Sequence, residues 1–201
     1  MEGYIDFYGK VNFNSVSKLK KQVEDFMAKG MTKLHLYLST NGGKLHDAIS
    51  AYYYFKRTPE LKVYTYNCDY VDSAGLVVYC IGENRYSLKS SSFLFHPITC
   101  TVPENTVYWL YKMREHLNSM DRKNEKVLEI LLDRVNLEKK ELDDLINKGA
   151  DITTEKAKEI NLVTEIKDSF SLNIAKEKLF ASIHGSEQLE SKSQPLYPEY
   201  G

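Results

Sequence analysis

Residues 68–82 read CDYVDSAGLVVYCIG, and this stretch decides the expected fold. A β-rich run, LKVYTYN over 61–67, leads into it, and the small apolar residues AGLVV over 74–78 predict a buried helix after Ser73. A serine at a sharp strand-to-helix junction has its hydroxyl lifted off both elements, and the backbone N–H groups that follow point toward an approaching anion. Serine is also a common helix N-cap. Ser73 therefore has both a catalytic and a purely structural interpretation.

Strands and helices alternate on both sides of this stretch. Strands are predicted at 4–9, 33–40, 61–67, 84–88 and 92–96. The first helix is predicted to start at Asn14 or Ser15 and to end near Gly30, and the second follows the NGG of 41–43 and stops before Pro59. This order predicts an α/β domain with a largely parallel sheet.

The chain becomes strongly charged after Pro103. From residue 104 to about 134 the apolar side chains recur three, four or seven positions apart, which predicts one long amphipathic helix. Such a helix either lies on its own domain or packs as an arm on another subunit. We favour the arm, because a helix that rises ~1.5 Å per residue would outrun a domain of this size.

The rest of the chain is predicted to complete the domain and then to form a C-terminal segment outside it. A second helix is predicted over 138–148, followed by a short helix capped by Thr153 or Thr154 and a closing strand over 162–166. Together with the preceding elements these define one domain over 1–168. Residues 169–201 are expected to add a C-terminal helix, at about 172–183, and a flexible polar tail from Gly185.

The composition excludes several classes of partner. Lys and Arg number 27 against 28 Asp and Glu, so a net charge of −1 provides no basic field for nucleic acid or an anionic membrane. No apolar run approaches the roughly 18–20 residues that cross a bilayer, and no secretory signal is visible. Three cysteines without a CxxC pair predict a reducing, cytoplasmic setting. Five histidines without ligand spacing predict no metal, and no organic cofactor is indicated.

Three features with chemical potential come at the ends of successive predicted strands. Gly42-Gly43 would let the backbone approach a ligand and leave N–H groups unblocked, as an oxyanion site requires. Ser73 and His96 also follow strands, and open α/β sheets place their sites at the carboxyl ends of strands. A serine nucleophile needs a base at neutral pH, and imidazole is suited to that role. Taken singly, each feature is explained by turn or packing chemistry; together they predict a site.

Four motifs, in this order, resemble the proteolytic subunit of the Clp protease, a serine peptidase of the ClpP/crotonase superfamily. They are YLSTNGG at 37–43, SAG at 73–75, FLFHP at 93–97 and TEKAKEINLV at 154–163. The resemblance covers roughly residues 3–167. It implies a repeated β-β-α superhelix with a long protruding handle helix at about 104–134.

The resemblance also implies roles for particular residues. Ser73 would be the nucleophile and His96 the general base, while the backbone N–H groups of Gly42, Gly43 and Ala74 would form the oxyanion hole. The handle helix would pack subunits of a homo-oligomer across two stacked rings. Peptides or unfolded proteins would be the substrate, and a ring ATPase that feeds them would be a partner.

The chain departs from the family pattern at several positions. Counted back from Ala157, the aspartate of the triad falls at Gly149, and the nearest acid is Asp151. Asp72 stands directly before Ser73, where the family usually has a small residue. The chain starts almost at its first strand, which leaves little room for the N-terminal gating loops of the family and weakens the expectation of docking to its usual ATPase.

Three functions are consistent with these observations. The leading one is a serine endopeptidase with Ser73, His96 and Asp151 as the catalytic residues. The second is a catalytically silent scaffold or regulatory subunit, which a missing acid would favour and the retained Ser73–His96 pair disfavours. The third is a crotonase-like acyl-CoA enzyme, which would leave both of these residues unexplained.

Overall fold

The structure is a computed structural model that describes residues 1–99, 107, 109–170 and 178–186. Its strands are β1 (Glu2–Gly9), β2 (Lys33–Thr40), β3 (Lys62–Asp72), β4 (Asn84–Leu88), β5 (Ser92–Leu94), β6 (Asp151–Thr153), β7 (Glu165–Lys167) and β8 (Leu179–Gly185). Its helices are α1 (Phe13–Ala28), α2 (Leu45–Lys56), α3 (Ala74–Tyr79), α4 (Leu110–Leu132), α5 (Lys139–Asn147) and α6 (Thr154–Glu159). This mixed α/β architecture confirms the predicted fold class.

The sheet is parallel apart from one short pair. Its main path runs β6-β5-β3-β2-β1-β8, with β4 paired to β3 and β7 paired to β4. Strand β3 is 11 residues long, so its first half pairs with β4 and its second half, Tyr70–Asp72, pairs with β5. Only β5 and β6 are antiparallel among the described strands. The length of β3 brings the carboxyl ends of β2, β3 and β5 together.

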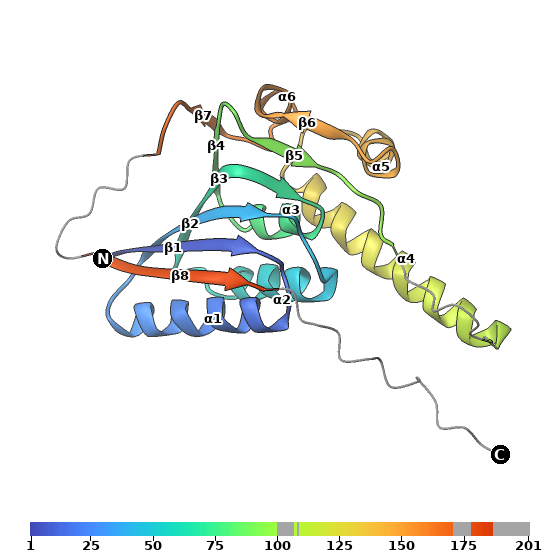
Figure 1. Cartoon of the computed structure of the whole chain (residues 1–201), viewed down its shortest axis with the longest axis horizontal. Helices are drawn as coiled ribbons and strands as arrows, with labels where there is room; N and C mark the ends of the chain where they lie inside the picture. The colour runs from blue at the N-terminus through green and yellow to red at the C-terminus, as the bar shows by residue number, and fades with distance from the viewer. Residues whose placement is uncertain (100–106, 108, 171–177, 187–201) are drawn as a thin grey trace, which may run out of the picture.

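The hydrophobic core lies between the sheet and the helices on one of its faces (Figure 1). Strand β2 buries Leu34, Leu36 and Leu38 against them, while α1 contributes a stripe at helical spacing that includes Leu19 and Val23. Helix α1 begins earlier than predicted, because the side chain of Asn12 accepts a hydrogen bond from the Ser15 N–H at 3.0 Å and Ser15 caps it reciprocally.

The C-terminal helix predicted at 172–183 is wrong over its last residues. Residues 179–185 form strand β8, which pairs in parallel with β1 from Gly3 opposite Leu179 to Gly9 opposite Gly185. Its side chains alternate between the two faces of the sheet, and the open edge of β1 supplies the backbone partners that a helix would not need. Residues 171–177 and 187–201 of the predicted helix and tail lie outside the described residues.

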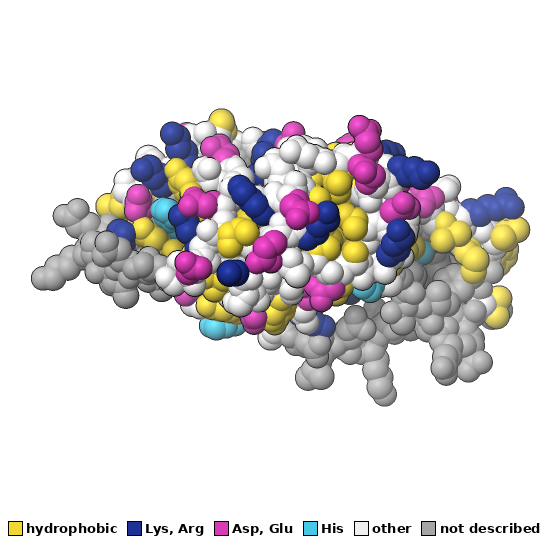
Figure 2. Space-filling view, turned by 90° about the horizontal axis from the view of Figure 1, so that it is seen from above, with side chains coloured by type: hydrophobic (Ala, Val, Ile, Leu, Met, Phe, Trp, Pro, Cys, Tyr) yellow, Lys and Arg dark blue, Asp and Glu magenta, His cyan; other side chains and the backbone are white. Residues whose placement is uncertain are grey.

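Helix α4 projects from the domain (Figure 1), and its two ends differ in how deeply their apolar side chains are buried. The C-terminal end is buried through Leu128 and Leu131, whereas Leu110 and Leu117 at the other end are 65% and 53% exposed. Figure 2 shows apolar side chains at this end of the molecule, and mixed charges over the rest of that face. Residues 104–106 and 108 of the predicted helix are outside the described range. None of the described helices combines the length and apolar character needed to cross a bilayer.

Candidate active site

Ser73 occupies a strained turn between β3 and α3. Its φ of 52° and ψ of −121° lie in a region that non-glycine residues rarely adopt. Its N–H donates to the Leu94 carbonyl at 2.8 Å, which fixes the turn to the end of β5. Its hydroxyl makes no capping hydrogen bond to α3, so the N-cap interpretation does not describe this serine. The turn instead presents the hydroxyl at the top of the sheet, as a nucleophile requires.

The paired glycines pack directly against this turn. Gly42 has a φ of 77°, and a Cβ there would come within 2.6 Å of the Asp72 carbonyl oxygen and 2.9 Å of the Ser73 Cβ. Only glycine permits both this backbone conformation and this approach. The Gly42 N–H donates to Thr40 Oγ1 at 3.1 Å and is therefore already engaged. Of the three predicted oxyanion donors, the residues that line the neighbouring cavity are Gly43 and Ala74.

His96 follows the end of β5 by two residues and lines the same cavity as Ser73. Its Nδ1 lies 2.6 Å from the carbonyl oxygen of Pro97, an acceptor that selects the tautomer protonated at Nδ1. In that tautomer Nε2 carries the lone pair that a base needs. Within the described residues no hydrogen bond joins His96 to Ser73 or to a carboxylate. The structure thus brings the serine and the histidine to one cavity and orients the imidazole by a backbone carbonyl.

Asp151 lies at the start of β6, a strand that the sequence did not predict. It pairs with Leu94 of β5, and its side chain is exposed. Asp72 lies in the same row, because it also pairs with Leu94, on the other side of β5. Burial raises the pKa of the Asp72 carboxyl above its usual range, partly opposed by a hydrogen bond from the Leu94 backbone, and the nearby charges of Asp151 and Asp69 raise the pKa further. Acidic groups therefore gather on the sheet side of Ser73.

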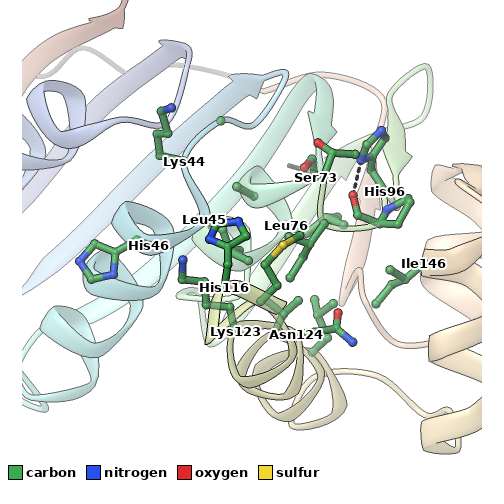
Figure 3. Close-up of a pocket in the computed structure, with 18 residues that line it drawn as sticks. Lys44, Leu45, His46, Ser73, Leu76, His96, His116, Lys123, Asn124 and Ile146 are labelled. Atoms are coloured by element: carbon green, nitrogen blue, oxygen red, sulfur yellow. Dashed lines mark hydrogen bonds between the residues drawn. The ribbon is translucent and has the colours of Figure 1, made fainter. Parts of the chain in front are cut away.

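The cavity has a volume of about 300 Å³ and lies between the first turn of α2, the start of α3 and the inner face of α4. Apolar side chains that include Leu76, Val127, Leu131 and Ile146 form much of its wall. Figure 3 shows Ser73 and His96 at one end of it, and His116 and Lys123 on α4 toward the other. No Asp or Glu is among its described lining residues.

Sequence reasoning missed the contribution of α4 to this cavity. His116, Met120, Lys123, Val127 and Leu131 form one stripe, with intervals of four, three, four and four residues. That spacing identifies one face of a helix, but which element the face meets depends on tertiary packing. No cluster of three metal-ligating side chains occurs among the residues that the structure describes.

Comparisons with known proteins agree with the fold of this chain. The family model described as Clp protease matches residues 2–170. A ClpP1 variant from Listeria monocytogenes has a similar structure, with a TM-score of 0.69 at 16% identity over 83% of this chain and 91% of that chain. A peptidase from Plasmodium falciparum is similar at a TM-score of 0.68 and 17% identity, over 83% of this chain and 96% of that chain. No curated protein matched the sequence.

Proposed function

Because the chain belongs to the Clp protease family, we propose that it is a serine peptidase that cleaves peptides or unfolded proteins at Ser73. The observation that carries this proposal is the strained turn at Ser73. It holds a hydroxyl that does not cap α3 beside the glycine turn of Gly42, and Ser73 lines the same cavity as His96. A turn of this kind costs stability when a residue other than glycine occupies it. If the turn served packing alone, a glycine would serve better than a serine.

The proposed reaction is acyl transfer in two steps. Ser73 Oγ attacks the peptide carbonyl carbon while His96 Nε2 takes the hydroxyl proton. The backbone N–H groups of Gly43 and Ala74 hold the resulting oxyanion. As the C–N bond breaks, His96 returns the proton to the leaving amine. Water, activated by the same imidazole, then attacks the acyl ester and releases the second product.

The imidazole is proposed to be oriented by the Pro97 carbonyl, through the 2.6 Å contact at Nδ1. A carbonyl fixes the tautomer but carries no full charge, so it stabilises the imidazolium less than a carboxylate does. Asp151, paired with Leu94 on the neighbouring strand, is proposed to supply negative charge to His96 from a greater distance. This arrangement supports a slower enzyme than one with a carboxylate in direct contact.

The projecting end of α4 supports a proposal of self-association. Its exposed apolar residues, among them Leu110, Met113 and Leu117, lie at intervals of three and four on one face. We propose that this face packs on a second copy of the chain in a homo-oligomer, in the stacked-ring manner that the family resemblance implies. A ring ATPase is proposed only as the supplier of unfolded chain. The free thiols of Cys68 and Cys80 fit the proposed cytoplasmic location.

The decisive experiment is intact mass after treatment with a fluorophosphonate, beside a Ser73→Ala variant. We expect one adduct on the wild-type chain and none on Ser73→Ala, because only an activated serine reacts. Peptide hydrolysis should be lost in the same variant. Absence of an adduct on the folded, assembled wild type would contradict the peptidase proposal and favour a catalytically silent subunit.

A further inference from the structure

The described residues that line the cavity beside Ser73 include lysines and histidines but no acids. Basic or titratable residues line it on two separate elements: Lys44 and His46 at the start of α2, and His116 and Lys123 on α4. Figure 3 shows the side chains of Lys44 and His46 pointing away from the centre of the cavity. No carboxylate lines it among the described residues. Asp47, in the same turn of α2 as His46, is not among the lining residues. It lies near Lys20, where burial lowers the pKa of the ammonium and the charge of Asp47 partly opposes that shift. Among the residues that the structure describes, the charged side chains that line this cavity are therefore basic, although the chain as a whole has near-equal totals of acidic and basic residues.

Of these residues, Lys123 is the one best placed to bind an anion in the cavity. Its side chain is half-buried on the α4 stripe that faces the cavity, between Met120 and Val127. Within the described residues no carboxylate lies within ion-pair distance of its Nζ. An ammonium that is partly desolvated by apolar neighbours interacts more strongly with an incoming anion than one in bulk water does.

The start of α2 also favours an anion in this cavity. This helix of 12 residues begins at Leu45 on the cavity wall, and Lys44 provides no side-chain cap. Its first backbone N–H groups and the positive end of its dipole therefore lie on the same side of the cavity as His116 and Lys123 (Figure 3). Much of the remaining wall is apolar, through residues such as Leu76 and Val127, and accommodates an aliphatic stem.

We propose that this cavity is a specificity site for substrates with an acidic side chain close to the scissile bond. The methylene stem of a glutamate would pack on the apolar wall while its carboxylate pairs with Lys123. This inference rests on the proposed peptidase function, since it assumes that Ser73 is the point of attack. It makes Lys123 a determinant of specificity and gives it no part in the bond-breaking steps.

The test is a set of synthetic peptides that carry Glu, Gln or Lys at each position flanking one cleavage site, with cleavage read by mass spectrometry. We expect kcat/KM to be about two- to fivefold higher for Glu than for Gln at one position, the range of a half-exposed ion pair, and lowest for Lys. Lys123→Glu should reverse the order at that position. Lys126→Glu, an equal change of charge on the same helix but away from the cavity, should leave the order unchanged.

The outcomes separate this inference from the proposed function. Cleavage that depends on Ser73 but does not distinguish Glu, Gln and Lys would overturn the specificity site and leave the peptidase in place. An equal response to Lys123→Glu and Lys126→Glu would also overturn it, because the effect would then come from overall charge. Absence of both cleavage and fluorophosphonate labelling would overturn the two proposals together.

Discussion

Asp151 pairs with Leu94 across the antiparallel strands β6 and β5, and Leu94 lies two residues before His96. The Phe95 N–H donates to the Ala150 carbonyl at 2.8 Å, which extends the same register by one residue. Continuing it places Gly149 opposite His96. Gly149 is also the position at which the family pattern has its aspartate. The position opposite His96 in this register thus carries no side chain, and the nearest acid, Asp151, lies two residue pairs away.

Gly149→Asp should increase activity. Gly149 has a φ of 62°, a conformation that aspartate tolerates better than most residues, and no atom lies within 4 Å of a Cβ built there. A carboxylate at this position would replace the Pro97 carbonyl as the partner of His96 Nδ1 and stabilise the imidazolium. We expect kcat/KM for a peptide to rise by at least about tenfold. Gly149→Asn, equal in shape and uncharged, is the control; equal rates for the two variants would contradict this account.

Asp151→Asn should lower activity only moderately. Its carboxylate acts on His96 from two residue pairs away and through solvent, so we expect a loss of about tenfold or less in kcat/KM. That is well short of the ~10⁴-fold that follows loss of a directly bonded acid. The measurement is peptide hydrolysis, with circular dichroism to establish that the fold is retained. A loss of several orders of magnitude would instead make Asp151 the direct partner of His96.

The order of elements could be predicted because each depends on local periodicity. The extension of β3 from Asn67 to Asp72 could not, because polar residues interrupt its apolar pattern. Asn67 is nevertheless fully buried, and its Nδ2 donates to the Ser92 carbonyl at 2.9 Å. In the sequence, the polar amide of Asn67 indicated the end of a strand. In the structure, the Ser92 carbonyl satisfies that amide, so the strand continues past Asn67. Strand β8 was missed for a related reason, since its partner β1 lies at the opposite end of the chain.

Some features of the candidate site could likewise be predicted from the sequence, and others could not. Ser73, His96 and the glycine turn could be predicted because each follows a strand, and strand ends meet in a parallel sheet. The contact between His96 and Pro97 and the engagement of the Gly42 N–H by Thr40 are matters of ångström geometry that no spacing encodes. The basic side chains of α4 were missed because a charged stripe is typical of a solvated helix face.

Gly42→Ala should damage both stability and reactivity. A methyl group there would meet the Asp72 carbonyl oxygen and the Ser73 Cβ below 3.0 Å and would also disfavour a φ of 77°. Gly30→Ala is a matched control, because Gly30 has a φ of 89° and no atom within 4 Å of the added Cβ. We expect Gly30→Ala to cost about 1–2 kcal/mol in the free energy of unfolding and Gly42→Ala about 1–3 kcal/mol more. Only Gly42→Ala should slow fluorophosphonate labelling; equal effects would show that the glycine turn does not support Ser73.

Asp72→Asn should stabilise the fold at neutral pH. Burial raises the pKa of this carboxyl in the folded state, with Asp151 and Asp69 adding to the effect, so the folded chain binds the proton more tightly than the unfolded chain. Stability therefore falls as the pH rises from the ordinary value of 3.8 through the raised value, and the full penalty applies above it. An asparagine does not ionise and avoids this penalty.

Because Asp72 is partly exposed, we expect a gain of no more than about 1 kcal/mol at pH 7. Urea denaturation should show this gain shrinking toward zero as the pH falls below the ordinary range of an aspartate. Asp25→Asn, an exposed site on α1, serves as the control and should give no gain at either pH. A gain from Asp72→Asn that is independent of pH would show that the charge is not its cause.

Leu110→Lys combined with Leu117→Lys should dissociate the chain without unfolding it. Both side chains are more than half exposed, so the fold does not depend on them, whereas an interface built on this face of α4 would have to bury two ammonium groups. Sedimentation should show the wild type as a particle far larger than 23.2 kDa and the variant near that mass.

Two controls separate assembly from folding. Asn118→Lys adds one charge to the same part of α4 at an exposed polar position and should leave the particle intact. Leu128→Ala, at the buried end of the helix, should instead cost about 2–5 kcal/mol in the free energy of unfolding. A wild-type chain that sediments as a monomer would contradict the proposed assembly. If the double variant kept the size of a larger wild-type particle, the interface would have to lie on another surface.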